Sequence, residues 1–353
     1  MPAYSLALKS DSSMIRTCDS ESSTADWAGQ ERMYSPVDWH GVSPAVIAQR
    51  GKPWNQDPTD VPWLDRPNPL NALRAKRLND LISEEEEELL LKWITDGYFV
   101  MKDILDHEQD NLLDDYVKFL DDVWIADKAF NGLQFMSLHI PGRAPGPIGH
   151  AEILRWPLPM RLEVRDSQQW RIHYQHPYSN AAMKLTKTSR VLRMCSLILD
   201  EPAVLLNSIG LKYSSQSGLH QDLCAYHIHP ANRLVGGWLA AEDVNPKAGP
   251  LLVFPGTHRV PMWPGWNNYP QTNLRTCHLE TRYAETAYLA EAVKDITPVS
   301  ILLNKGDIML QHSLLIHSAA KIEDKSATRY SMVLHYGAKG VDKMHEVEGP
   351  FNY

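Results

Sequence analysis

The stretch LLNSIGLKYSSQSGLHQD, residues 205–222, decides the fold class because it joins a β-prone run to a polar loop and a histidine motif. Leu205–Tyr213 predicts a strand, and Ser214–Gly218 predicts the loop that follows it. From Ala203 onward, short β-prone runs alternate with turn signals, roughly every 8–12 residues. We therefore predict a mainly β protein with flanking helices, built as a double-stranded β-helix, or cupin-like jelly roll.

The motif at the end of this stretch places His220 and Asp222 two positions apart. Side chains two apart on an extended strand leave the same face, so both can reach one metal ion, whereas a helix would need a spacing of three or four. The pattern alone is weak, because the chain has 15 histidines. A surface histidine beside a solvated aspartate is the alternative interpretation.

A second segment, KGDIMLQHSLLIH at residues 305–317, contains two histidines that are candidates for the third metal ligand. A turn signal precedes an apolar run, which predicts a buried strand. His312 and His317 are five apart, so in a regular strand they face opposite sides and only one points at the metal. We favour His317 because the next predicted strand, Ala327–Tyr336, returns an arginine beside it.

That arginine, Arg329, suggests a cosubstrate. Two imidazoles and one carboxylate form the donor set of non-heme Fe(II) oxygenases, which leaves positions open for dioxygen and a cosubstrate. A guanidinium pairs with a carboxylate through two parallel hydrogen bonds, so Arg329 is a candidate anchor for the distal acid of 2-oxoglutarate. An arginine at the rim of the sheet that reaches water is the alternative. Strand alternation puts Arg329 on a face with Ser331, Val333 and His335, opposite Tyr330, Met332, Leu334 and Tyr336.

Together with HQDLCAYHIHP (220–230), LVGGWLAAEDVNPKAGPLLVFPGTHR (234–259) and TRYSMVLHY (328–336), the sequence resembles the phytanoyl-CoA dioxygenase family of Fe(II)/2-oxoglutarate oxygenases over about residues 84–337. The resemblance implies that His220, Asp222 and His317 bind iron(II). It also implies that Arg329 holds the far carboxylate of 2-oxoglutarate and that Trp238 lies close to this cosubstrate. For Trp238, a role as a core aromatic is the alternative.

Other positions of the family pattern refine the expected chemistry. Two turns, at residues 249–251 and 255–259, match the family's strand connections, and His258 within the second is either a donor beside the site or structural. Ala319 departs from the small polar residue that many members have, so a hydroxyl there must come from Ser318 or be absent. Halogenating relatives lack the carboxylate that Asp222 supplies, which argues against halogenation.

The leading functional interpretation is hydroxylation of a small-molecule C–H bond by dioxygen, with 2-oxoglutarate decarboxylated to succinate. Desaturation, cyclisation or epimerisation with the same cofactors is an alternative, and so is a non-catalytic jelly-roll binding protein. The family's acyl-CoA preference is not carried over, because the sequence contains no recognisable coenzyme A site.

The composition of the chain argues against several classes of protein. The net charge of −8 is dispersed, so we expect no nucleic-acid partner. The chain has no apolar run long enough for a membrane span and no apolar signal segment at its start. Its cysteines lack CxxC spacing, which predicts neither a zinc site nor a disulfide framework and fits a cytoplasmic location. Cys224 is expected to be a buried structural residue.

Residues 1–82 are expected to form an N-terminal tail and a surface-wrapping arm, the latter rich in Pro and Trp, with a contact to a second subunit as the sharper alternative. Residues 83–353 form the oxygenase domain. It begins with a helix, Ser83–Thr95, whose stop is Gly97, followed by a strand at Tyr98–Met101 and a helix at His107–Val123.

Two aromatic-rich insertions are expected in this domain. The first, near 125–188, is either satellite core or a wall of the substrate pocket. The second, near 260–289, contains Trp263–Tyr269 and is expected to form a lid over the metal. Deleting Trp263–Tyr269 should therefore damage substrate turnover far more than iron binding.

Overall fold

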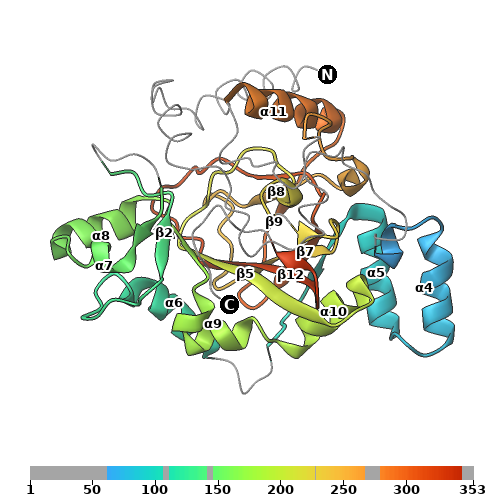
Figure 1. The fold of residues 1–353 in the computed structure, drawn as a ribbon, viewed down its shortest axis with the longest axis horizontal. Coiled ribbons are helices and arrows are strands. Elements are labelled where there is room, and N and C mark those ends of the chain that lie inside the picture. Colours follow the sequence, from blue (N-terminus) through green and yellow to red (C-terminus); the bar gives the residue numbers. More distant parts are fainter. Residues whose placement is uncertain (1–61, 106–110, 141–145, 227, 267–278, 344–353) are drawn as a thin grey trace.

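Antiparallel strands in the order β1-β10-β7-β12-β5-β4-β2-β3 form the central sheet of the protein (Figure 1). The computed structural model describes residues 62–105, 111–140, 146–226, 228–266 and 279–343. A three-stranded sheet, β11-β8-β9, and a two-stranded sheet, β13-β6, complete the described β structure. The strands are β1 Tyr98–Met101, β2 Gln134–Met136, β3 Ile148–Gly149, β4 Arg171–His173, β5 Ala203–Leu211, β6 Ile228–His229, β7 Leu234–Ala240, β8 Leu251–Val253, β9 Val299–Ile301, β10 Ile308–His312, β11 His317–Ala319, β12 Ser331–Ala338 and β13 Asp342–Lys343.

Helices cover the face of the large sheet that points away from β8 and β9. In Figure 1, α9 and α10 lie below this sheet, whereas α11 lies beyond the small sheet on the other side. This arrangement confirms the predicted jelly roll with flanking helices. The helices are α4 Pro69–Leu78, α5 Glu84–Asp96, α6 Leu112–Asp122, α7 His150–Ile153, α8 Leu158–Ser167, α9 Asn180–Leu185, α10 Ser189–Leu199 and α11 Leu279–Val293, with 3-10 turns η1 Trp63–Asp65, η3 His176–Tyr178, η4 Asp222–Cys224 and η5 Thr257–Arg259.

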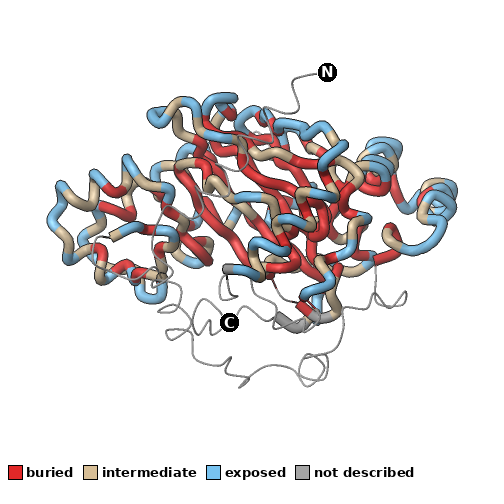
Figure 2. The backbone as a smooth tube through the Cα atoms, turned by 90° about the horizontal axis from the view of Figure 1, so that it is seen from above, coloured by how far each residue is buried: buried red, intermediate tan, exposed pale blue. Residues whose placement is uncertain are grey.

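Strand β12 divides the interior into two regions. The side chains on one of its faces join the main apolar core under the helices. The middle of the molecule is largely buried (Figure 2). The other face of β12 points between the sheets, where Val333 packs against two separate apolar clusters. The predicted alternation of this strand is confirmed, because Tyr330, just before β12, and Met332, Leu334 and Tyr336 on it all belong to the main core, whereas Val333 does not.

The start of the folded domain follows the sequence signals closely. Ser83 caps α5 by accepting from the backbone of Glu86, whose side chain accepts in return from the Ser83 backbone. Gly97 ends the helix with a φ of 80°, and a Cβ at this position would lie 2.5 Å from His258 Nδ1. Glycine is required there for both reasons. Strand β1 has the predicted bounds and pairs with β10.

The apolar run 308–317 is not the single strand that its pattern predicted. Residues 308–312 form β10 in the large sheet, and His317 begins β11 in the small one. Between them, Leu314, Leu315 and Ile316 each enter a different apolar cluster. The run is therefore a buried corner between two sheets, and strand alternation does not relate His312 to His317.

Other predicted bounds shift by a few residues. Strand β5 ends at Leu211 rather than Tyr213, and β12 begins at Ser331 rather than Ala327. Helix α6 begins at Leu112, whereas residues 107–110 of the predicted helix lie outside the described residues. These differences arise because tertiary pairing sets the ends of elements more strongly than local propensity does.

The first predicted insertion, near 125–188, extends the large sheet. It supplies β2, β3 and β4, and β4 pairs with β5. Trp170 packs 5.4 Å from Trp124 in the main core, which supports the core interpretation for this aromatic.

Most of the predicted arm, residues 1–61, lies outside the described residues. The described end of the arm packs on the domain, since Trp63 Nε1 donates to the Leu197 carbonyl at 2.7 Å. Within the described residues, none of the helices combines the length and apolarity that crossing a membrane requires.

Candidate metal centre

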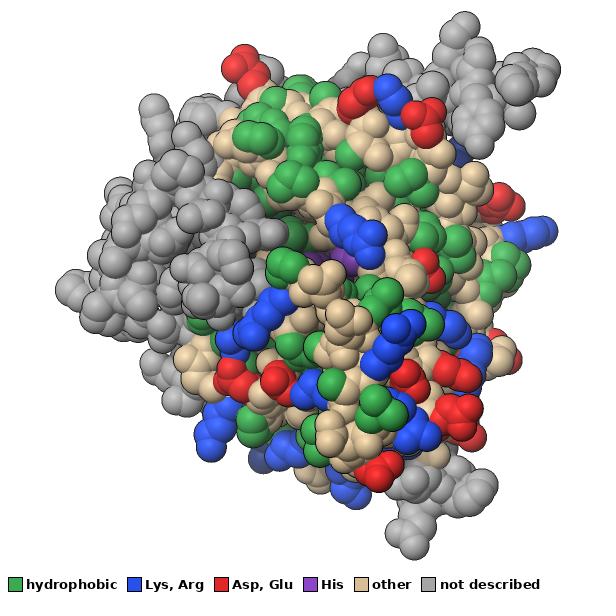
Figure 3. All heavy atoms as spheres, turned by 90° about the vertical axis from the view of Figure 1, so that its right-hand side faces the viewer, with side chains coloured by type: hydrophobic (Ala, Val, Ile, Leu, Met, Phe, Trp, Pro, Cys, Tyr) green, Lys and Arg blue, Asp and Glu red, His purple; other side chains and the backbone are tan. Residues whose placement is uncertain are grey.

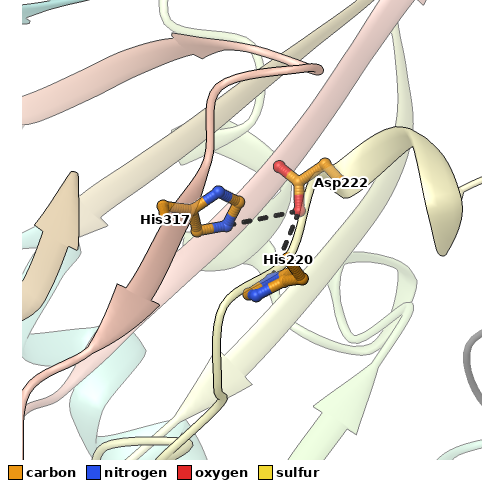
Figure 4. A group of neighbouring side chains, drawn as sticks. All are labelled: His220, Asp222 and His317. Atoms are coloured by element: carbon orange, nitrogen blue, oxygen red, sulfur yellow. Dashed lines mark ion pairs between the residues drawn. The ribbon is translucent and has the colours of Figure 1, made fainter. Parts of the chain in front are cut away.

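His220 and His317 face each other across a pair of backbone hydrogen bonds. The amide of each donates to the carbonyl of the other, and both N–O distances are 3.1 Å. Because His317 begins β11, the loop that carries His220 is tied to the edge of the small sheet. The two imidazole rings consequently lie with their centroids 4.1 Å apart (Figure 4).

Asp222 completes the cluster from the first turn of η4. Gln221 holds the intervening backbone in place, since its Nε2 donates to the carbonyls of Val260 and Leu314 at 3.0 and 2.9 Å. Asp222 Oδ1 lies 3.9 Å from His220 Nε2 and 3.6 Å from His317 Nε2. The predicted trio thus meets, with one ligand atom from each residue lying within 4.8 Å of the others.

The protonation states of the trio suit a divalent metal. Nδ1 of His220 lies 2.8 Å from the Gly218 carbonyl, and Nδ1 of His317 lies 2.9 Å from the Leu315 carbonyl, so each Nδ1 donates and each Nε2 keeps its lone pair. Burial lowers the pKa of His220 to about 4. Burial alone would raise the pKa of Asp222, but the neighbouring imidazoles bring it well below its usual value. Neutral imidazoles with an ionised carboxylate fit iron(II).

Arg329 lies just before β12 and is 4% exposed. Its Nη1 donates to the Gly249 carbonyl at 2.8 Å, and its guanidinium lies 5.0 Å from the ring centre of Trp238. Burial, followed by the like charge of Arg171, lowers its pKa to about 9. Among the residues that the structure describes, no carboxylate pairs with this guanidinium. A buried cation in this state suits an incoming carboxylate.

Strand β7 connects Arg329 with the trio. At Gly236, an added Cβ would lie 3.0 Å from Asp222 Oδ2. Trp238 follows two residues later on the same face, about 7 Å along the strand, and reaches Arg329. The cluster and the arginine therefore lie near neighbouring same-face positions of β7, Gly236 and Trp238.

The remaining histidine candidates lie elsewhere. His312 Nε2 is 3.2 Å from Asp65 Oδ2 in η1, and the ring of His312 lies 5.5 Å from that of His258. His258 and His312 therefore lie beside each other, and neither belongs to the trio of His220, Asp222 and His317. Ser318 and Ala319 are both buried on β11, and Cys224 is buried in the apolar cluster behind η4.

The described part of the predicted lid packs directly behind Asp222. Met262 and Trp266 share an apolar cluster with Leu223 and Cys224. Residues 267–278, which include the rest of Trp263–Tyr269, lie outside the described residues. The lid stays a prediction, since the packing fixes only where the segment begins.

Glu285 on α11 gives this region a pH dependence. It is 2% exposed beside Trp266 and Cys224, and burial raises its pKa to about 7. The folded state then holds a proton that the unfolded state releases near pH 4.5. Stability is therefore full below that pH and decreases as pH rises to 7, by about 3 kcal/mol.

We expect Glu285→Gln to remove this decrease. Urea unfolding at pH 5 and pH 8 measures it as the difference in the free energy of unfolding. An equal pH dependence in both proteins would show that Glu285 titrates normally.

Two polar residues next to Asp222 were missed by the sequence reasoning. Gln311 Nε2 donates to Asp222 Oδ2 at 2.8 Å, and His335 Nε2 lies 3.7 Å from the same oxygen. His335 could have been found from the sequence, because strand alternation places it on the same face of β12 as Val333, and this face points between the sheets. Gln311 carried no comparable signal, since a polar residue in an apolar strand also fits an edge position.

The comparisons with known proteins agree with this geometry. Residues 161–327 match the family model described as phytanoyl-CoA dioxygenase (PhyH). The peroxisomal phytanoyl-CoA dioxygenase of Rattus norvegicus is 30% identical over 131 residues, which cover 36% of this chain and 35% of that protein. The chain thus spans about a third of the length of that relative.

Solved structures support the fold. The non-heme alpha-ketoglutarate-dependent carbocyclase SnoK matches with a TM-score of 0.51 and 12% identity, over 74% of this chain and 86% of that one. The epimerase SnoN, solved with Fe3+, alpha ketoglutarate and nogalamycin RO, matches with a TM-score of 0.50 and 17% identity, over 73% and 85%. At these identities the likeness concerns the jelly roll. The family-model match over residues 161–327 and the rat relative show that this part of the chain is similar to the phytanoyl-CoA dioxygenase family.

Proposed function

We propose that the protein is a non-heme Fe(II)/2-oxoglutarate-dependent dioxygenase that hydroxylates a C–H bond of a small molecule. In this reaction 2-oxoglutarate is decarboxylated to succinate. His220, Asp222 and His317 would bind the iron, and Arg329 would bind the distal carboxylate of 2-oxoglutarate beside Trp238. The observation that carries the proposal is the meeting of three metal-type ligand atoms within 4.8 Å, together with a buried arginine beside Trp238.

The roles of the residues follow from their positions. Bound iron(II) and 2-oxoglutarate supply the oxidising power for C–H cleavage by dioxygen. The neutral Nε2 atoms of His220 and His317 and the ionised Oδ1 of Asp222 would hold the metal. Arg329 would orient the dicarboxylate by charge, and Trp238 packs against that guanidinium. The apolar cluster around Trp266 limits water behind η4.

The trio is not fully closed off from solvent. His220 keeps 22% of its side chain exposed, whereas Asp222 and His317 keep 8% and 6%. On one face of the molecule, histidine atoms lie in a recess with hydrophobic side chains and a basic side chain around it, although the view does not label them (Figure 3). The partly open His220 side of the cluster therefore supports entry of substrate and dioxygen from solvent.

The experiment that tests the proposal measures succinate. The protein is loaded anaerobically with iron(II) and 2-oxoglutarate, exposed to oxygen with a panel of small molecules, and scored for succinate above the substrate-free level. Stimulated succinate release with an oxidised product supports the proposal. Binding of a small molecule without iron-dependent succinate release would instead support a jelly-roll binding protein.

Desaturation, cyclisation and epimerisation use the same cofactors. The similar structures include a carbocyclase and an epimerase, so the product of each succinate-releasing reaction has to be identified. A product that has gained one oxygen atom supports hydroxylation, and a product without it favours one of the other outcomes.

The proposal extends to compartment and assembly. Cysteines without framework spacing support a reducing compartment such as the cytoplasm, although the rat relative is peroxisomal. The turn η1 is anchored on α10. We propose that the part of the arm that precedes it, residues 1–61, contacts a second copy of the chain. Light scattering of the full chain and of a chain lacking residues 1–61 tests that contact.

A further inference from the structure

We infer that Gln311 is a positioning residue that holds Asp222 in one-oxygen metal binding and aligns it with His317. The inference rests on the metal site of the proposed function and adds to it a residue outside the predicted ligands. It concerns the affinity and the coordination number of the metal, which are measured without any substrate.

The two oxygens of Asp222 have separate environments. Oδ1 faces the imidazoles, with Nε2 of His317 at 3.6 Å and Nε2 of His220 at 3.9 Å. Oδ2 faces the large sheet and accepts from Gln311 Nε2 at 2.8 Å. One oxygen is therefore directed at the metal position and the other is occupied by an amide donor.

Gln311 is held firmly enough to act in this way. It is 6% exposed on β10, which lies between β1 and β7, where its partners are Tyr98 and Gly236. A Cβ on Gly236 would lie 2.9 Å from Gln311 Cγ and 3.0 Å from Asp222 Oδ2. The glycine thus makes room for the hydrogen bond between the two side chains.

The same amide also touches a second member of the trio. Gln311 Nε2 lies 3.4 Å from His317 Nε2, so its two hydrogens point toward the carboxylate and toward the imidazole lone pair. Before metal binding, the amide therefore links two of the three ligands across the gap between the sheets. Less rearrangement is needed when the metal arrives.

His335 does not replace Gln311 in this role. Its ring lies on Tyr226 with centroids 3.7 Å apart, and its Nε2 is 3.7 Å from Asp222 Oδ2, beyond hydrogen-bond length. Without the amide, Oδ2 would be free to rotate toward the metal. Asp222 would then bind through both oxygens and occupy a position that dioxygen or the cosubstrate needs.

The test uses Gln311→Met, which keeps the length of the side chain and removes its donor. Anaerobic titration with iron(II) or manganese(II) measures the dissociation constant, and the visible spectrum of the cobalt(II) form reports coordination number. We expect the dissociation constant to rise about 10–100-fold and the cobalt(II) bands to shift toward higher coordination. Gln311→Asn, with an amide too short to reach Oδ2, should behave in the same way.

Gln175→Leu is the matched control, because Gln175 is also buried and its Nε2 donates to the Tyr116 hydroxyl away from the cluster. It should lower thermal stability without changing metal affinity. Wild-type affinity and cobalt(II) bands in both folded Gln311 variants would overturn the inference. Metal binding that survives His317→Ala would instead contradict the proposed metal site, so the two failures are distinguishable.

Discussion

Replacing His317 by alanine is expected to abolish iron(II) binding and succinate release, whereas His312→Ala should retain both. His317 Nε2 is one of the three candidate ligand atoms and lies 3.6 Å from Asp222 Oδ1, but His312 is engaged with Asp65 in another part of the fold. Loss of a metal ligand should weaken binding beyond the roughly 10–100-fold that supporting residues produce. Anaerobic iron titration and a succinate assay measure the two effects.

His312→Ala provides the control for general damage to the fold. It removes a buried imidazole that packs near Trp93 and His258, so it should lower the melting temperature. If this variant lost iron while His317→Ala kept it, the assignment of the third ligand would be wrong.

The second large effect is expected at Arg329. Arg329→Leu should raise the KM for 2-oxoglutarate at least about 30-fold, because removing one partner of a buried charge pair costs about 2–5 kcal/mol. Arg329→Lys should recover part of the loss, since it keeps the charge but not the two parallel hydrogen bonds. Iron affinity in the absence of 2-oxoglutarate should stay at the wild-type value in both variants.

A matched control for Arg329 is Arg161→Leu. Arg161 Nη1 also donates to a single backbone carbonyl, that of Trp124 at 2.8 Å, among the helices outside the sheets. Its loss should leave the KM for 2-oxoglutarate unchanged. An unchanged KM in Arg329→Leu would assign this arginine a purely structural role.

Features that depend on neighbours in sequence could be predicted from the sequence. The capping box at Ser83, the stop at Gly97 and the bounds of β1 follow from local hydrogen bonds and backbone preferences. The two faces of β12 follow from strand alternation. The three metal-ligand candidates could be predicted only from all the motifs taken together, because the spacing of these residues along the chain does not by itself place them near one another.

Features set by long-range packing could not be predicted in this way. The corner at 313–316 has the composition of a strand, and only the separate clusters that receive Leu314, Leu315 and Ile316 reveal a change of sheet. The pairing of β4 with β5 and the bond from Gln311 to Asp222 likewise join residues far apart in the chain. Their partners are fixed by topology, which local patterns do not encode.

The reciprocal hydrogen bonds between His220 and His317 have a consequence for unfolding. They hold the metal-site loop on the edge of the small sheet, because any opening that separates β11 from the loop carrying His220 also separates two of the three donor atoms. A metal would then bind only the closed form and slow its opening in proportion to occupancy. Hydrogen exchange at the amides of these two histidines would therefore report metal loading without reference to turnover.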